Sequence, residues 1–119
     1  MKKTLVLGAT DNPDRYAYRA AHMLTQHGHD IVPVGIKTGE VAGQPILNGK
    51  PAVGEIDTVT LYVGSRNLPE WYDYILGLQP KRIIFNPGTE NQELVQRAQA
   101  QGIETVYGCT LVMLSVGQY

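Results

Sequence analysis

The stretch that most constrains the fold is the segment from Lys3 to Tyr16. Its apolar run Leu5-Val6-Leu7 ends at Gly8, a short polar loop follows, and a helical pattern begins at Tyr16. This order of strand, loop and helix is typical of the first unit of a nucleotide-binding α/β fold. Glycine lets the backbone turn sharply near a ligand phosphate, and the N–H groups at the next helix start attract the anion. Arg15 adds a forked donor that suits a phosphate.

The loop does not carry the dinucleotide-binding fingerprint G-x-G-x-x-G, because Gly8 is its only glycine. A single glycine after a strand is weak evidence for a ligand. In the alternative interpretation, Gly8 merely makes the turn and Arg15 is a solvated surface charge. The loop by itself leaves both interpretations open.

A family resemblance extends over nearly the whole chain. The loop Gly8–Tyr16 resembles the G-A-S/T-x-x-x-x-R-Y loop of the small bacterial CoA-binding proteins, which are similar to the CoA-binding domain of the succinyl-CoA synthetase alpha subunit. The match continues, in the same order, through His27-Gly28-His29, Ile31-Val32-Pro33-Val34, Phe85–Asn91 and Gly108–Leu114. The family commonly has Pro-Val-Asn-Pro where this chain has Pro33-Val34-Gly35-Ile36, and this departure leaves the adenosine-side contacts of the loop open.

The resemblance implies a stand-alone module that binds CoA or acyl-CoA, with no evident catalytic activity. It implies that the diphosphate lies against Gly8, Ala9, Thr10, Asn12, Arg15 and Tyr16. Lys37 is the candidate on the adenosine side, and Pro87 and Gly88 would approach the pantetheine arm. Val34, Gly64 and Ser65 complete the candidate binding residues. Such a module could sense acyl-CoA levels or carry CoA to a protein partner.

Beyond the first unit, strand and helix patterns continue to alternate. Strands are predicted at residues 4–7, 31–34, 57–63, 82–85 and 103–106, and helices over 16–27, from 67 onward and from 89 to 101. This alternation predicts an α/β, Rossmann-like domain over residues 1–119. Its five-stranded sheet would be doubly wound and mostly parallel, with helices on both faces. Ligands of such sheets lie at the carboxyl ends of the strands, so Gly64–Arg66 and Asn86–Gly88 are predicted to line the crevice.

Several residues carry local predictions about the ends of these elements. Gly28 and Gly102 are expected to end helices in a left-handed conformation. Asn67 and Thr89 are expected to cap helix starts. Pro33 lacks an N–H donor, so it is placed at a strand end or a bulge.

Other residues carry predictions about burial. Leu111, Val112 and Leu114 are expected in the core, within a short apolar segment that covers the sheet end. Trp71 and Tyr74 fall off the apolar stripe of their helix. They are explained by a wide stripe, by a subunit interface in a homodimer, or by stacking against an adenine.

Composition narrows the function classes. The net charge of −1 shows no basic excess of the kind that nucleic-acid-binding proteins have. The single cysteine excludes an internal disulfide and fits a reducing cytoplasm. The apolar run behind Lys3 is too short for a signal peptide or a membrane span, so a cytoplasmic protein is expected. His27 and His29 are interpreted as helix-end and turn residues, because no cysteine or carboxylate nearby in sequence completes a metal site.

Catalysis has little support in the sequence. Ser65 and Cys109 are the available nucleophiles, but no histidine falls on a predicted ligand-edge loop, so no catalytic residue is assigned.

Lys37 follows the second strand where NAD enzymes usually place an acidic residue, which counts against NAD. A lysine there suits a phosphorylated ribose, as in CoA or NADP. The alternatives are a small NADP-dependent oxidoreductase, or a subunit of one, and an interaction protein that has lost its ligand. The sequence does not specify an acyl group, a partner or an oligomeric state.

Overall fold

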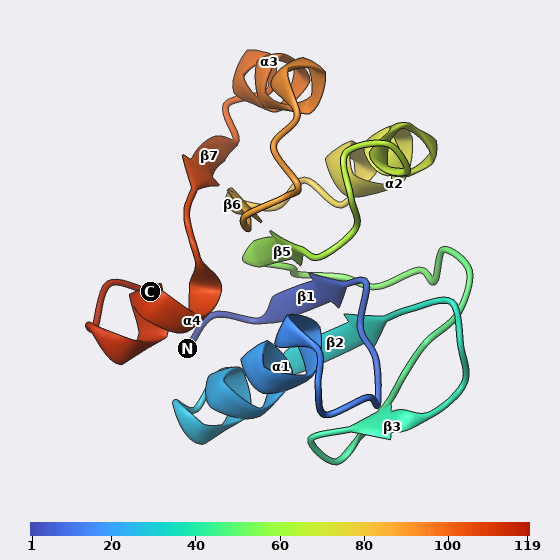
Figure 1. Ribbon diagram of the computed structural model, residues 1–119. Coiled ribbons are helices and arrows are strands. Elements are labelled where there is room, and N and C mark those ends of the chain that lie inside the picture. Colours follow the sequence, from blue (N-terminus) through green and yellow to red (C-terminus); the bar gives the residue numbers. More distant parts are fainter.

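The protein is described over residues 1–119 by a computed structural model. The strands are β1 (Thr4–Leu7), β2 (Ile31–Val34), β3 (Glu40–Val41), β4 (Gln44–Pro45), β5 (Thr58–Leu61), β6 (Arg82–Phe85) and β7 (Glu104–Tyr107). The helices are α1 (Tyr16–Gln26), η1 (Leu68–Trp71), α2 (Tyr72–Gly77), α3 (Gln92–Ala100) and α4 (Thr110–Ser115). Figure 1 shows a central sheet between two groups of helices.

The central sheet has five parallel strands in the order β2-β1-β5-β6-β7. Thr4 of β1 pairs with Ile31 on one side and with Thr58 on the other, so the three strands start level with one another. This strand order is one of the two common doubly wound arrangements. The predicted α/β, Rossmann-like class is therefore confirmed.

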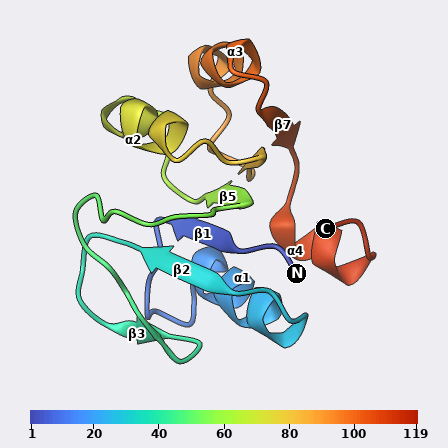
Figure 2. The same cartoon turned by 180° about the vertical axis from the view of Figure 1, so that it is seen from behind.

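The two faces of the sheet have different chemistry. Because side chains alternate along a strand, successive residues of β1, β5 and β6 point to opposite faces. The α2/α3 face is apolar and buries Leu5, Leu7, Val59, Leu61, Ile83 and Phe85. The α1/α4 face carries Val6 but also the buried polar residues Thr58, Thr60, Arg82 and Asn86. In Figures 1 and 2 the helices α2 and α3 lie on one side of the sheet and α1 on the other.

Helix α1 packs closely because its buried stripe is made of small residues, Ala17, Ala20 and Ala21, with Leu24. The helix ends at Gly28, where φ is 84°. The N–H of Gly28 donates to the Thr25 carbonyl and that of His29 to the Leu24 carbonyl, both main-chain bonds of a Schellman motif. Gly102 ends α3 with the same pair of bonds. Both glycine predictions are confirmed.

The two N-cap predictions are wrong. Asn67 makes no side-chain cap, and it precedes the 3₁₀ turn η1 before α2 begins at Tyr72. Thr89 is buried, and its hydroxyl donates to the Asn86 carbonyl. The residue that caps α3 is Asn91, whose side-chain oxygen accepts from the Leu94 N–H at 2.9 Å.

The connection from β2 to β5 contains no helix. It forms the β3–β4 hairpin and then crosses toward α2 as a strap, residues 47–53, visible in green in Figure 1. The Tyr74 hydroxyl donates to the Pro51 carbonyl at 2.6 Å, and the Lys50 ammonium lies 5.5 Å from the centre of the Trp71 ring. Trp71 and Tyr74 are half-buried against the core and hold the strap to this helix.

Helix α4 confirms the predicted short helical segment near the end of the chain. Thr110 and Leu114 are buried and Leu111 is half-buried. Val112 is 57% exposed, so its predicted core position is wrong. None of the helices has the length and apolar content needed to span a lipid bilayer.

Candidate functional site

The first loop is held against the carboxyl ends of β2 and β5. The N–H groups of Gly8 and Ala9 both donate to the Val34 carbonyl, each at 2.9 Å. Gly8 has a φ of 96°, and a Cβ atom on it would lie 2.8 Å from the Tyr62 carbonyl oxygen. Only glycine fits this conformation so close to the neighbouring strand. The sequence interpretation of Gly8 as a sharp turn therefore agrees with the structure.

Three hydrogen bonds between residues close in sequence shape the rest of this loop. The Asn12 N–H donates to the Thr10 hydroxyl at 3.1 Å, and the Asn12 side-chain oxygen accepts from the Asp14 N–H at 3.0 Å. The Arg15 N–H then donates to the Asn12 carbonyl. Thr10 and Asn12 thus act on the loop itself and set the direction in which α1 starts.

The start of α1 has free N–H groups. Arg15 is the N-cap with extended backbone, no side chain accepts from the first turn, and that turn holds no acidic residue. Among the loop and first-turn groups, the N–H groups of Thr10, Asp11, Tyr16, Ala17 and Tyr18 make no hydrogen bond within the chain. Arg15 and Tyr16 are exposed. The helix dipole and these donors make this point attractive to an anion.

The loop after β2 lies directly against the first loop. A Cβ atom on Gly35 would come within 2.3 Å of the Ala9 carbonyl oxygen, so glycine is required at this position. The Asn48 amide donates to the carbonyls of Gly35 and Lys37 at 2.8 and 3.1 Å. Lys37 is exposed. The Val34 side chain is buried in the core, so Val34 contributes here through its carbonyl.

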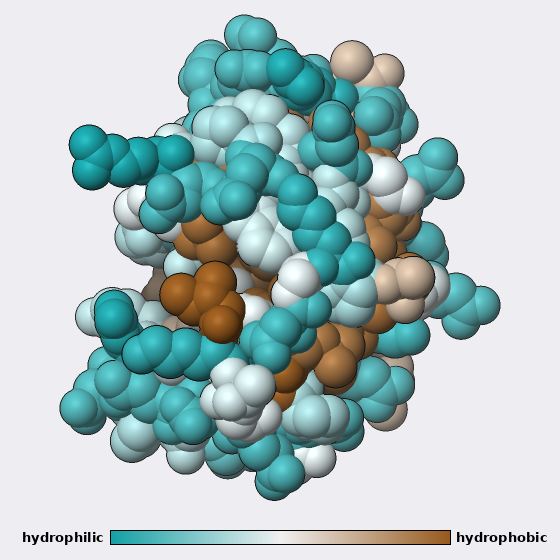
Figure 3. All heavy atoms as spheres, turned by 90° about the vertical axis from the view of Figure 1, so that its right-hand side faces the viewer, coloured by the Kyte–Doolittle hydropathy of each residue, from teal (hydrophilic) through white to brown (hydrophobic).

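The ends of β5 and β6 complete the same edge. Gly64 and Ser65 are exposed after β5, and the Ser65 hydroxyl accepts from the Asn91 amide at 3.3 Å. Pro87 and Gly88 are exposed after β6, where the Gly88 N–H donates to the Glu90 carboxylate at 3.0 Å. Figure 3 looks onto the side of the molecule toward which β1 and β2 run, and shows a largely hydrophilic surface with apolar atoms near its middle.

Asn86 is a residue whose part the sequence analysis missed. It is 2% exposed, and its amide donates to the Thr60 hydroxyl at 2.7 Å and to the Leu61 carbonyl at 2.9 Å. Its side-chain oxygen accepts from the Thr110 N–H at 2.9 Å. One side chain therefore ties β5, β6 and the start of α4 together below the ligand edge. Its position directly after a buried strand was the only signal in the sequence.

Tyr62 lies beside this cluster. Its hydroxyl is buried without a hydrogen-bond partner, while the nearby hydroxyls of Thr60 and Thr110 are bonded to each other at 2.8 Å. Burial raises the pKa of Tyr62 to about 12, because the charged phenolate would lose its hydration. Tyr62 is therefore neutral at physiological pH and supports the Gly8 turn through its backbone.

The available nucleophiles lack a partner base. Cys109 is a free, half-buried thiol at the start of α4. The histidines lie on or just after α1, and His29 sits at the opposite end of the sheet, where its Nδ1 accepts from the Lys2 N–H at 3.0 Å. Burial lowers the pKa of His29. No group of three potential metal ligands occurs in the chain.

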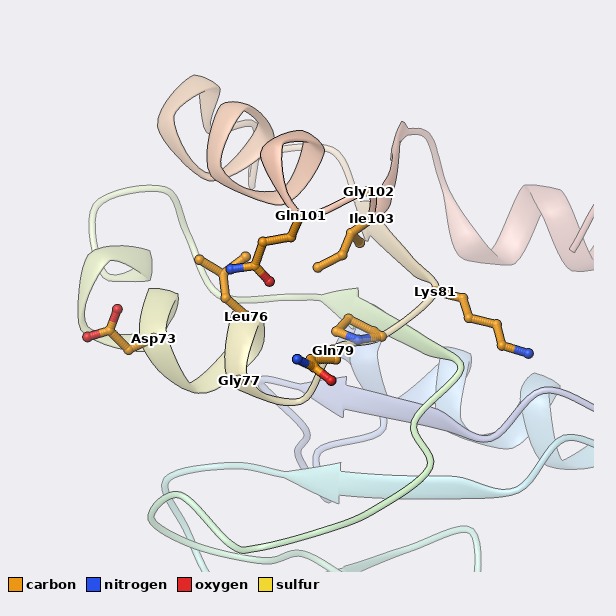
Figure 4. Close-up of a pocket in the computed structure, with 9 residues that line it drawn as sticks. Asp73, Leu76, Gly77, Gln79, Lys81, Gln101, Gly102 and Ile103 are labelled. Carbon is orange, nitrogen blue, oxygen red and sulfur yellow. The ribbon is translucent and has the colours of Figure 1, made fainter.

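A hollow of about 820 Å³ lies away from this edge. It is lined by Asp73, Leu76, Gly77, Gln79, Pro80, Lys81, Gln101, Gly102 and Ile103. Lys81 and Ile103 directly precede β6 and β7, so the hollow is at the amino end of the sheet. Figure 4 shows Asp73 and Lys81 extending outward on opposite sides of it. The hollow contains none of the predicted binding residues.

The sheet order and the loops at its carboxyl edge define a doubly wound α/β domain of the kind that binds phosphate-bearing ligands. The chain belongs to the family of CoA-binding domains, whose family model, described as "CoA binding domain", matches residues 2–115. The predicted family is thus confirmed. The match leaves only the first residue and residues 116–119 outside it.

Individual proteins are similar to this chain over most of its length. A crystal structure of an uncharacterized protein is 57% identical, with a TM-score of 0.97 over 100% of this chain and 98% of that one. The uncharacterized protein YneT of Bacillus subtilis is 26% identical over 85% of this chain and 76% of its own length. An acetyl-coenzyme A synthetase 1 of Ca. Korarchaeum cryptofilum shares the fold at 19% identity and a TM-score of 0.73, over 90% of this chain and 25% of that one.

Proposed function

We propose that this chain binds CoA or acyl-CoA at the carboxyl edge of its sheet and performs no chemistry on it. The observation that carries the proposal is the uncapped start of α1 beside the tightly turned Gly8 loop. The family match to CoA-binding domains supports the choice of ligand. The diphosphate would face the free N–H groups of Thr10, Tyr16 and Ala17.

The predicted residues then divide into two roles. Arg15 and Lys37 are exposed cations that would contact phosphate groups, Arg15 at the diphosphate and Lys37 at the ribose phosphate. Gly8, Ala9 and Val34 would act indirectly, because their main-chain groups bond to one another and fix the loop. Asn12 belongs to this second group.

The pantetheine arm would run over the ends of β5 and β6. Gly64, Ser65, Pro87 and Gly88 are exposed there, and Gly88 has a φ of 91°. The Gly88 N–H is engaged by Glu90 and would have to exchange that carboxylate for an amide oxygen of the ligand. Ser65 and Cys109 lack a neighbouring base, which supports a role in sensing or carrying CoA with a partner.

Calorimetry on ligand-free protein tests the proposal. CoA is expected to bind, dephospho-CoA more weakly, and Arg15→Ala is expected to lower the affinity for both by about tenfold to a hundredfold. Arg97→Ala, which removes a similar exposed cation on α3, is the matched control and should bind CoA normally. NADP binding without CoA binding would overturn the proposal and favour the oxidoreductase alternative.

Lys37→Ala separates the two phosphate contacts. If Lys37 faces the ribose phosphate, this variant weakens CoA binding but leaves dephospho-CoA binding unchanged. An equal loss for both ligands would place Lys37 elsewhere. A free-thiol assay with acetyl-CoA tests the absence of chemistry, and release of CoA above the uncatalysed rate would contradict a binding-only role.

A further inference from the structure

The two edges of the central sheet are built differently, and β2 forms a closed edge. Pro33 has no N–H group, and its carbonyl accepts from the Leu47 N–H at 2.9 Å. The Gly35 N–H donates to the Leu47 carbonyl at 2.9 Å, so Leu47 adds a bridge beside Val34. Pro33 therefore lies inside β2, not at the predicted strand end or bulge, because its missing donor faces outward on an edge strand.

The opposite edge, β7, is open. The Glu104 N–H donates to the Lys81 carbonyl and the Gly108 N–H to the Phe85 carbonyl, both toward β6. Because main-chain groups alternate along a strand, those of Thr105 and Tyr107 point away from the sheet. Neither residue makes a main-chain hydrogen bond on that side. In Figures 1 and 2 no other strand lies beyond β7.

β7 has little protection at this edge, since its one charged residue is Glu104 at its first position. Proteins usually blunt an exposed edge strand with proline, lysine or a bulge, because its free N–H and C=O groups pair with other chains. The strand Glu104-Thr105-Val106-Tyr107 contains none of these features. Tyr107 is 53% exposed. An edge of this kind is suited to adding another strand.

We propose that a second copy of this chain pairs its own β7 with this edge, antiparallel, about a two-fold axis at Val106. Thr105 then faces the partner's Tyr107, and Tyr107 faces the partner's Thr105. Each of these two pairs exchanges two N–H to C=O bonds, since both residues point outward. All outward main-chain groups of the two strands are satisfied in this register.

Neighbouring registers fit less well. With the axis at Thr105, Tyr107 would face the partner's Ile103, whose N–H is already bonded to the Ala98 carbonyl. With the axis at Tyr107, Thr105 would face the partner's Cys109, which is the N-cap of α4 and whose carbonyl accepts from the Met113 N–H. The register at Val106 is the one that leaves no outward group unpaired.

Side chains are compatible with the same register. Glu104 lies opposite the partner's Gly108, so no like charges meet across the axis. Tyr107 lies opposite a threonine, and aromatic and β-branched residues form favourable cross-strand pairs.

Sedimentation equilibrium tests the dimer. The unmodified protein is expected to form a reversible dimer, and Thr105→Pro, which removes one outward N–H per copy, should weaken association roughly 30-fold or more. Thr105→Val keeps that N–H and is the matched control, so it should dimerise normally. Circular dichroism would show that each variant is folded. A protein that stays monomeric at millimolar concentration, or a Thr105→Pro variant that dimerises as well as Thr105→Val, overturns the proposal.

Crosslinking tests the register without relying on proline. In a Cys109→Ser background, Val106→Cys places the two thiols at a non-hydrogen-bonded pair on the axis, where Cα atoms are about 4.5 Å apart. This variant should form a disulfide-linked dimer on oxidation, whereas Glu104→Cys should not. Equal crosslinking of both variants would contradict an axis at Val106.

Discussion

The two faces of the sheet show how one small domain separates stability from positioning. The α2/α3 face is apolar on β1, β5 and β6, and it holds the larger hydrophobic cluster. On the α1/α4 face, β5 and β6 instead bury hydroxyl, guanidinium and amide groups, those of Thr58, Thr60, Arg82 and Asn86. Apolar packing is strong but does not select direction, whereas hydrogen bonds fix particular atoms. We infer that the first face stabilises the fold and the second sets where α4 and the β6 turn lie.

Arg82 shows how the polar face is held together at its amino end. The side chain is 7% exposed, its Nε donates to the Thr58 hydroxyl at 3.1 Å, and its guanidinium lies 4.4 Å from the centre of the Tyr119 ring. Its Nη1 donates to the Tyr119 main-chain oxygen at 3.2 Å. The carboxyl end of the same face is held by Asn86, close to the candidate ligand loops.

The largest effect is expected from the apolar face. Phe85→Ala removes a fully buried ring from the α2/α3 cluster and should lower the free energy of unfolding by about 3–5 kcal/mol. Urea denaturation measures this. The comparison of the faces fails if this variant costs less than a substitution in the Asn86 cluster.

Asn86→Leu is expected to cost about 2–3 kcal/mol, because it leaves the Thr110 N–H and the Leu61 carbonyl buried without partners. Hydrogen exchange should also become faster in α4, which a general loss of stability would not single out. Asn67→Leu is the matched control, since Asn67 is exposed and makes no side-chain cap. An equal loss of unfolding free energy in the two variants would mean that the Asn86 hydrogen bonds do not stabilise the fold.

Asn91→Ala should destabilise by about 1–2 kcal/mol, because Asn91 caps α3 and also accepts from the buried Tyr72 hydroxyl at 2.8 Å. This sharpens the comparison by probing a polar contact beneath the α2/α3 helices. Thr89→Val distinguishes the helix cap from the turn, because it removes the hydrogen bond of the Thr89 hydroxyl to the Asn86 carbonyl and leaves the cap of α3 in place. A larger loss for Thr89→Val would reverse our assignment of the cap.

The smallest effect at neutral pH is expected for Tyr62→Phe, because the Tyr62 hydroxyl has no partner to lose. Its pKa of about 12 lies above the usual value of 10, so the unfolded chain releases this proton at lower pH than the folded chain. The free energy of unfolding is therefore unaffected by this group below pH 10, and it falls as the pH rises from 10 toward 12. Tyr62→Phe should unfold less readily than the unmodified protein between these values. Identical alkaline unfolding curves would contradict the assignment.

The sequence predicted the helices and strands better than the contacts between them. The five strands, the α1 stripe and the ends at Gly28 and Gly102 follow from local patterns, because periodicity and left-handed glycine are properties of neighbouring residues. The caps were harder to predict. Thr89 and Asn91 lie two residues apart, and what decides between them is the turn bond of Thr89 to the Asn86 carbonyl and the contact of Asn91 with the Tyr72 hydroxyl.

The candidate site was predictable to a similar degree. Gly8 and the uncapped start of α1 follow from a strand–loop–helix pattern. The importance of Asn48 and Gly35 does not, because each acts on a loop distant in the chain. The binding roles of Arg15, Lys37 and the remaining predicted residues stay predictions until a ligand is measured.

The strap between β2 and β5 also has a use in protein engineering. Gly49 is exposed, has a φ of 72° and has open space around it, between anchors at Asn48 and Lys50. Lengthening a loop carries a small entropic penalty, about 0.6 kcal/mol for each doubling. A fluorescent peptide inserted at Gly49 would sit next to the Lys37 loop without disturbing the sheet. The domain could thus be converted into an optical reporter of whatever occupies that edge.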